Sequence, residues 1–385
     1  MIKYENFNVF LRKHYLTFLF VIILCPIFIS LDFSQGLKFD QFNDYTKYKY
    51  PSIPISVLII SVLSIYNFKD LLFNKRIQIL FFLVLMYMCI NLYFGITRAA
   101  IVGPGMMFIV VSYFIFLRII NNRNVYKFFY MALSFVIIMK LLFDISFHEN
   151  LNPNHMKFIS QYFIIKNFKI YNYYDYFPFI YFLATALSVH NLLQRRHLIL
   201  SIVVLVASNV AIIVTESRLF MYSIYLIPFL YIFYQFTKLS LERYFYLFLF
   251  VSLATTLIVS FFGFKLSDPG LLSRYNHIHK YFGNFSLVNL IFPFLNQHRI
   301  ETSGSLHNEL LEIFSFFGFV IVYYLFLLRE MFCNTNREFK FISYLLMFVL
   351  IIGTLIQINI SNPYVGIITG AIFAIISSGS AKIRQ

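Results

Sequence analysis

The sequence has little charge and no tryptophan. Only 12% of its 385 residues are Asp, Glu, Lys or Arg, against about 25% in soluble globular domains. So few charged side chains cannot cover the surface of a water-soluble domain of this size. Hydrophobic residues make up 60% of the chain, and the 51 Phe and 29 Tyr residues raise the aromatic share to 21%. The composition therefore predicts that a lipid bilayer surrounds most of these side chains.

Cysteine is nearly as scarce. Cys25 and Cys89 lie in apolar runs and Cys333 lies in a charged segment, a spacing that suits neither a disulfide nor a thiolate metal site. The pair His277-x-His279 is as closely spaced as metal ligands often are, but no carboxylate or thiolate motif completes a coordination sphere. The sequence predicts no bound metal and no other cofactor.

Negative charge is the rarer sign, and the formal net charge is +15. A nucleic-acid-binding protein would gather its Lys and Arg residues into one basic stripe. Here they are scattered between apolar runs. The distribution excludes nucleic acid as the expected partner and leaves membrane lipids.

The apolar runs are long enough to be transmembrane helices, each of roughly 17–25 residues. The first follows basic residues as a signal peptide would, but it has no A-x-A cleavage site, so we expect a helix that is retained. We expect an all-α, polytopic bundle of about twelve spans that forms one domain over residues 1–385. The predicted spans are 14–31, 51–67, 77–94, 99–120, 125–147, 176–192, 197–214, 217–237, 243–264, 306–328, 341–360 and 362–378.

The basic residues predict the orientation of these spans. With the N-terminus inside, 18 of the 31 Lys and Arg residues fall in cytoplasmic segments, which are short. Positive residues favour the cytoplasmic side, so we expect both termini to be cytoplasmic. The long segments 32–50, 148–175 and 265–305 then face outward, and a long loop between helices is usually functional or disordered.

One candidate site lies where the tenth span begins at the outer face, at Gly304-Ser305-Leu306-His307-Asn308-Glu309. His307 falls in the first helical turn, where the helix dipole disfavours a proton on the imidazole. A neutral imidazole could accept a proton from a sugar hydroxyl. The alternative, equally supported by spacing alone, is a polar interfacial residue that caps the helix. Gly318 is expected roughly 16 Å deeper on the same helix, where a small residue would let another helix approach.

A second candidate site is the start of the eighth span, Thr215-Glu216-Ser217-Arg218. Free backbone N–H groups and a guanidinium together can bind a phosphate. The alternative is that Arg218 extends to the membrane interface, with Glu216 as its partner. Arg274 and Arg299, in the 265–305 segment, are expected at the same outer face.

Arg98 precedes the fourth span at this face as well. A Gly103-Pro104-Gly105 sequence follows a turn and a half later, and we expect it to break the helix. Broken helices at membrane depth are tolerated where they line protein or a cavity.

These motifs resemble those of a known family. His307-Asn308-x-x-Leu311 with Gly318 resembles the H-N-x-x-L-x6-G signature of the O-antigen polymerase and O-antigen ligase superfamily. Thr215-x-Ser217-Arg218 is similar to the family's T-x-S-R helix start, with Leu219 in place of its usual Gly. Arg274 resembles the second essential arginine. The motif order, the outer-face placement and the twelve-span topology agree across most of the chain.

The resemblance implies a metal-independent membrane glycosyltransferase whose substrates are oligosaccharides linked to undecaprenyl diphosphate. The enzyme would be a multi-pass protein of the bacterial inner membrane, with its active face and the large 265–305 loop in the periplasm. A chain-length regulator protein would be an optional partner. The implied catalytic residues are His307, Arg218 and Arg274, and the implied substrate-binding residues are Arg299, Arg98, Asn308 and Glu216.

Three functions fit this reading to different degrees. The Phe-, Tyr- and Ile-rich composition is typical of AT-rich coding sequence, as in many O-antigen gene clusters, and this favours the polymerase over the ligase. The alternative from another class is a non-enzymatic flippase or transporter for lipid-linked oligosaccharides. Transporters place ionisable groups near the bilayer midplane and often show repeated halves, and this sequence shows neither feature.

Overall fold

The computed structural model describes residues 15–25, 27–30, 52–67, 74–95, 99–119, 125–147, 164–165, 168–170, 176–215, 218–262, 276, 278–283, 285–286, 288–292, 309–353 and 363–377. The chain divides into two compact units, each formed by two stretches of sequence. Unit 1 comprises Met1–Tyr66 and Asn122–Tyr225, and unit 2 comprises Asn67–Asn121 and Leu226–Gln385.

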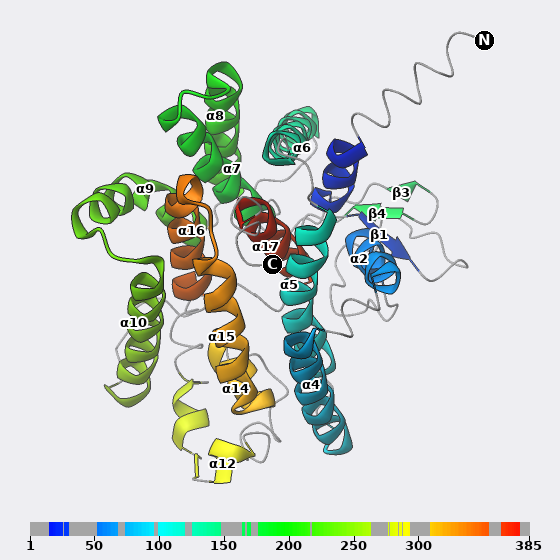
Figure 1. The fold of residues 1–385 in the computed structure, drawn as a ribbon, viewed down its shortest axis with the longest axis vertical. Coiled ribbons are helices and arrows are strands. Elements are labelled where there is room, and N and C mark those ends of the chain that lie inside the picture. Colours follow the sequence, from blue (N-terminus) through cyan, green and yellow to red (C-terminus); the bar gives the residue numbers. More distant parts are fainter. Residues whose placement is uncertain are drawn as a thin grey trace. The chain divides into compact units, whose positions relative to one another are not determined.

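Unit 1 is mainly helical (Figure 1). Its helices are Tyr15–Leu24, α2 (Ile55–Tyr66), α6 (Val125–Phe147), α7 (Tyr176–Leu193), α8 (Leu198–Thr215) and the first part of α9 (Arg218–Thr237). The packing of α7 against α8 forms its centre. Side chains from Phe179 to Leu187 are almost completely buried.

Unit 2 consists of the remaining helices (Figure 1). They are α4 (Lys75–Tyr93), α5 (Ala99–Ile119), the rest of α9, α10 (Leu241–Phe262), α12 (Val288–Ile291), α14 (Glu309–Phe317), α15 (Val320–Cys333), α16 (Lys340–Met347) and α17 (Pro363–Ser377). A 3-10 turn, η6 (Arg337–Phe339), precedes α16, and a π-helical turn, η7 (Phe348–Ile352), follows it. The packing of α5 along α17 forms the core of this unit.

The apolar helices indicate a membrane protein. By length and composition, three helices among the described residues can cross a bilayer, namely Lys75–Tyr93, Val125–Leu142 and Leu241–Ile258, and several shorter apolar helices accompany them. Large hydrophobic side chains on their surfaces are exposed, such as Phe250 at 70%. Such surfaces suit contact with lipid rather than water. The prediction of a helical membrane protein is thus confirmed.

A small antiparallel sheet in unit 1 was not predicted. Its strand order is β2-β1-β4-β3, and its strands are β1 (Ile27–Ser30), β2 (Ser52–Pro54), β3 (Ile164–Ile165) and β4 (Phe168–Ile170). β1 pairs with β2 on one side and with β4 on the other. Strands from the segments flanking 32–50 and from within 148–175 therefore meet in one sheet.

The first two predicted helices are consequently too long. The helix expected over 14–31 ends at Leu24, because Pro26 lacks an amide donor and disfavours the helical conformation of the residue before it. The helix expected from residue 51 begins at Ile55, immediately after β2 ends at Pro54. β2 is an edge strand, where a proline is tolerated.

The predicted break at Gly103-Pro104-Gly105 is also wrong. α5 runs without interruption from Ala99 to Ile119 with Pro104 inside it. Pro104 is the sixth residue of α5, so the helix loses one intrahelical hydrogen bond there. Such a loss is tolerated in apolar membrane helices, where neighbouring helices and local adjustments compensate for it. The neighbouring glycine Gly103 serves packing, since a Cβ there would lie 2.6 Å from the sulfur of Met88 on α4.

Glycines of α17 allow a close contact with α5 in unit 2. Figure 1 shows α17 beside α5, and the two helices approach at Gly366 and Gly370. A Cβ on Gly370 would lie 2.5 Å from the carbonyl oxygen of Ile109 and 2.8 Å from the amide nitrogen of Tyr113. A Cβ on Gly366 would meet only the Ile109 side chain closely, at 3.2 Å. Backbone therefore packs directly against backbone at Gly370.

The tenth predicted span is interrupted at Gly318, which corrects both its continuity and the expected role of this glycine. Gly318 has φ +54°, and it separates α14 from α15. Its N–H donates to the carbonyl oxygen of Phe314 at 2.8 Å, which closes the last turn of α14. The glycine is needed for its left-handed backbone, a common way to end a helix.

Gly318→Ala should therefore destabilise the protein. The left-handed conformation costs a residue with a Cβ about 1–2 kcal/mol, and thermal unfolding in detergent measures the loss. Gly283→Ala is the matched control, because a Cβ on Gly283 meets nothing within 4 Å. Equal melting temperatures for the two variants would contradict this role of Gly318.

Candidate active site

The predicted site residues fall mostly outside the described residues. These are His307, Asn308, Arg274, Arg299, Arg98 and Glu216. The remaining one, Arg218, is the first residue of α9. Described residues lie close to each of them in sequence, and their packing shows which helices adjoin the predicted site residues.

In unit 1, the start of α9 is fixed against the start of α7. The Phe220 ring contacts Phe179 and Phe182, with ring centroids 6.2 Å and 6.4 Å apart, and all three side chains are at most 1% exposed. Such aromatic pairs stabilise a buried contact beyond their buried area. The helix that begins at Arg218 therefore starts in a well-packed position, at the end of the unit where α7 begins.

In unit 2, part of the 265–305 segment packs on α14. Ile278 and Tyr281 form a buried hydrophobic cluster with Leu311, and Phe282, Phe285 and Phe314 pack against it. The Phe285 and Phe314 rings lie 6.2 Å apart. Leu311 is a residue of the His307 motif. Its side chain thus joins the long segment to the helix that follows His307.

Two polar residues near this cluster were missed as site candidates. Glu312, the residue after Leu311, is only 2% exposed. Asn91, near the end of α4, is fully buried and donates through Nδ2 to the carbonyl oxygens of Phe316 and Tyr87, at 2.8 Å and 2.7 Å. An ionisable or amide side chain buried in an apolar helix is the signal that could have identified both.

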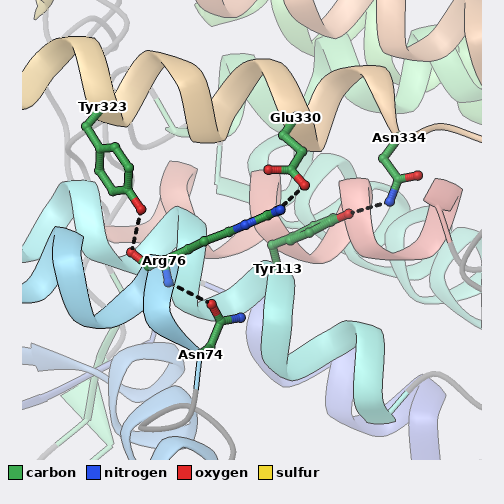
Figure 2. Close-up of polar contacts among 6 residues, drawn as sticks. All are labelled: Asn74, Arg76, Tyr113, Tyr323, Glu330 and Asn334. Atoms are coloured by element: carbon green, nitrogen blue, oxygen red, sulfur yellow. Dashed lines mark hydrogen bonds and ion pairs between the residues drawn. The ribbon is translucent and has the colours of Figure 1, made fainter. Parts of the chain in front are cut away.

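The opposite end of unit 2 carries a polar network (Figure 2). The guanidinium of Arg76, at the start of α4, forms an ion pair with Glu330 of α15. The Tyr323 hydroxyl donates to the backbone oxygen of Arg76 at 3.2 Å, and Asn334 donates through Nδ2 to the Tyr113 hydroxyl at 3.3 Å. Three helices, α4, α5 and α15, are thereby joined at this end.

A second ion pair joins α10 to the same end of α15. Arg329 pairs with Glu242, and the hydrogen bond to this carboxylate raises the pKa of Arg329. Burial raises the pKa of the neighbouring Cys333 thiol to about 11, so the thiol stays protonated near neutral pH and is a poor nucleophile. This end of unit 2 is thus held together by two ion pairs and by hydrogen bonds between its helices.

Within the described residues no group of three or more His, Cys, Asp or Glu side chains could hold a metal ion. Comparison with known proteins gives no further identification: no family model, no curated protein and no solved structure matches the chain.

Proposed function

We propose that the chain is an O-antigen polymerase, a metal-independent membrane glycosyltransferase that joins oligosaccharide repeat units linked to undecaprenyl diphosphate. The reaction takes place at the periplasmic face of the bacterial inner membrane. Its substrates are two lipid-linked glycans, and its products are a longer lipid-linked glycan and free undecaprenyl diphosphate.

The packing of Ile278 and Tyr281 against Leu311 carries this proposal. Arg274 precedes Ile278 by four residues, and His307 precedes Leu311 by four residues. Four residues of chain span at most about 14 Å. Chain length therefore keeps an arginine and a histidine that are 33 positions apart in the sequence within reach of one cluster in unit 2, which supports a shared site.

Another described contact supports the inclusion of Arg98. It immediately precedes Ala99, the buried first residue of α5. The preceding helix, α4, is hydrogen bonded near its end to α14 through Asn91 and Phe316. The residue next to Arg98 thus begins a helix that follows closely on the end of α4, and that end contacts α14 near its last residue.

Contacts within each unit also support the proposed topology. β1 and β4 pair although four predicted spans separate them in sequence. An even number of spans returns the chain to the side of the membrane from which it started, so the topology puts both strands at the same face. Arg76 and Glu330 pair at ends that the topology assigns to the cytoplasm. The topology of twelve spans with both termini inside leaves His307 and Arg218 at the periplasmic side.

The proposed chemistry divides between cations and a base. The acceptor hydroxyl attacks the anomeric carbon of the donor sugar, and the bond from that carbon to the diphosphate oxygen breaks. Arg218 and Arg274, aided by Arg299 or Arg98, stabilise the negative charge of the departing lipid diphosphate. His307 takes the hydroxyl proton, while Asn308 and Glu216 contact the glycans. Holding both lipid-linked substrates side by side supplies part of the rate.

Deletion of the gene tests the proposal and separates it from the ligase alternative. Lipopolysaccharide from a polymerase mutant should carry a single repeat unit on its core, which a gel resolves from polymer. Bare core would instead indicate a ligase. Unchanged polymer would contradict both enzymatic functions.

A further inference from the structure

The turn between α7 and α8 in unit 1 contains three consecutive basic residues, Arg195, Arg196 and His197, all exposed. Lys127 is also exposed and belongs to the same end of the unit, because its neighbour Tyr126 donates a hydrogen bond to Asn191 of α7 at 2.8 Å. Four basic side chains are therefore exposed at one end of unit 1.

The backbone of this turn favours glycine but carries charged residues instead. Arg195 has φ +55° and His197 has φ +47°. The Arg196 N–H donates to Asn191 O at 2.7 Å and the Arg195 N–H to Leu192 O at 3.1 Å, the Schellman pattern in which glycine usually takes the position of Arg195. Strain of this kind persists only where the surrounding structure holds the backbone in place.

Buried hydrogen bonds between α6 and the two helices of the turn hold the turn in position. The Tyr130 hydroxyl bonds to the hydroxyls of Ser188 and Ser201, at 2.9 Å and 3.0 Å, and so connects α6 to both helices of the turn. The Tyr130 ring also stacks on His197 with centroids 6.3 Å apart. The cations are thus presented by a rigid support, which lowers the entropic cost of binding an anion.

An exposed aliphatic stripe on α8 leads away from the turn. It consists of side chains that are 44–82% exposed, namely Ile199, Ile202, Val203, Val206 and Val210. At 1.5 Å per residue the stripe is about 16 Å long, close to half of a hydrocarbon core about 30 Å thick. A basic turn followed by an apolar stripe of this length matches a phospholipid headgroup and its acyl chains.

We propose that the α7–α8 turn is a binding site for an anionic phospholipid. Arg195 and Arg196 bind the headgroup phosphate, with Lys127 and His197 beside them, and the acyl chains lie along the α8 stripe. The site is independent of the proposed glycosyltransferase activity.

Thermal unfolding of the full-length protein in neutral detergent tests this site, with native mass spectrometry of retained lipid. Cardiolipin or phosphatidylglycerol should raise the Tm of the wild type, whereas phosphatidylcholine and inorganic phosphate should not. Arg195→Gly should raise the Tm without lipid by about 2–4 °C, because it relieves backbone strain, yet weaken lipid binding by about fivefold. Arg195→Gly with Arg196→Gln should remove most of the lipid-induced shift.

Lys238→Gly is the matched control, because Lys238 also has a left-handed backbone, at φ +47°, but lies outside this turn. It should relieve the same strain and retain the full response to anionic lipid. An undiminished lipid shift in the Arg195→Gly, Arg196→Gln variant would overturn the proposal. So would an equal shift from phosphatidylcholine or from inorganic phosphate.

Discussion

His307→Ala and Arg218→Ala are each expected to abolish O-antigen polymer while the protein remains in the membrane. Loss of a general base typically lowers a rate by about 10²–10⁴-fold, and loss of a group that stabilises developing negative charge costs about 10²–10³-fold. With a rate loss of this size, lipopolysaccharide gels should show a single repeat unit.

His279→Ala is the matched control for the histidine variant. His279 is exposed and lies in the same 265–305 segment, but outside the His307 motif. Its loss should leave the polymer ladder unchanged, and immunoblotting of membranes should show equal amounts of all three variants. Wild-type chain lengths in the His307 or the Arg218 variant would remove that residue from the mechanism.

Gly370→Ala is expected to be the most destabilising single-methyl change in unit 2. The added Cβ would lie 2.5 Å from the carbonyl oxygen of Ile109 and 2.8 Å from the Cβ of Ser112. Backbone atoms cannot rotate away as a side chain can, so α17 must separate from α5. Overpacking of this kind costs about 3 kcal/mol, which should lower the midpoint of thermal unfolding in detergent.

Gly366→Ala provides the comparison on the same helix. Its Cβ would meet the flexible Ile109 side chain at 3.2 Å and backbone only at 3.4 Å or beyond, so we expect a much smaller loss of stability. If the two variants unfold at the same temperature, close backbone contact between α5 and α17 is not what stabilises unit 2.

The sequence predicts the helices well because the bilayer fixes their length and apolar character. α6 coincides with the predicted span 125–147, and α7 and α8 begin and end within one residue of their predicted bounds. The spacing Gly366-x-x-x-Gly370 was an available signal for close helix packing. It was overlooked because Gly318 seemed to offer that role.

Backbone conformation was harder to predict. Hydrophobicity does not distinguish a continuous helix from α14 and α15 joined at a left-handed Gly318, nor does it reveal strands of two to four residues such as β1 and β4. The helix break depends on the backbone conformation of one glycine, and the strands depend on hydrogen bonds to partners far away in the sequence. Proline led to two opposite errors. A helix was expected to continue through Pro26 but ends at Leu24, and a helix was expected to break at Pro104 but continues through it.

The sequence predicts a chemistry for the candidate site but not its geometry. Short motifs point to residues such as His307 and Arg218 as candidates, yet they carry no information on which segments pack together. The cluster of Ile278, Tyr281 and Leu311 depends on apolar contacts between a long loop and a helix, which no local pattern specifies. Buried Glu312 was likewise hidden, because a charge in the first turns of a helix is ordinarily solvated.

Purified protein in liposomes, supplied with undecaprenyl-diphosphate-linked repeat units and no energy source, tests the central claim most directly. Glycans released from the lipid and separated by size should contain two or more repeat units, and chelation of divalent cations should leave the product unchanged. Glycans of one repeat unit only, from protein that is folded and inserted, would contradict the assignment as a glycosyltransferase.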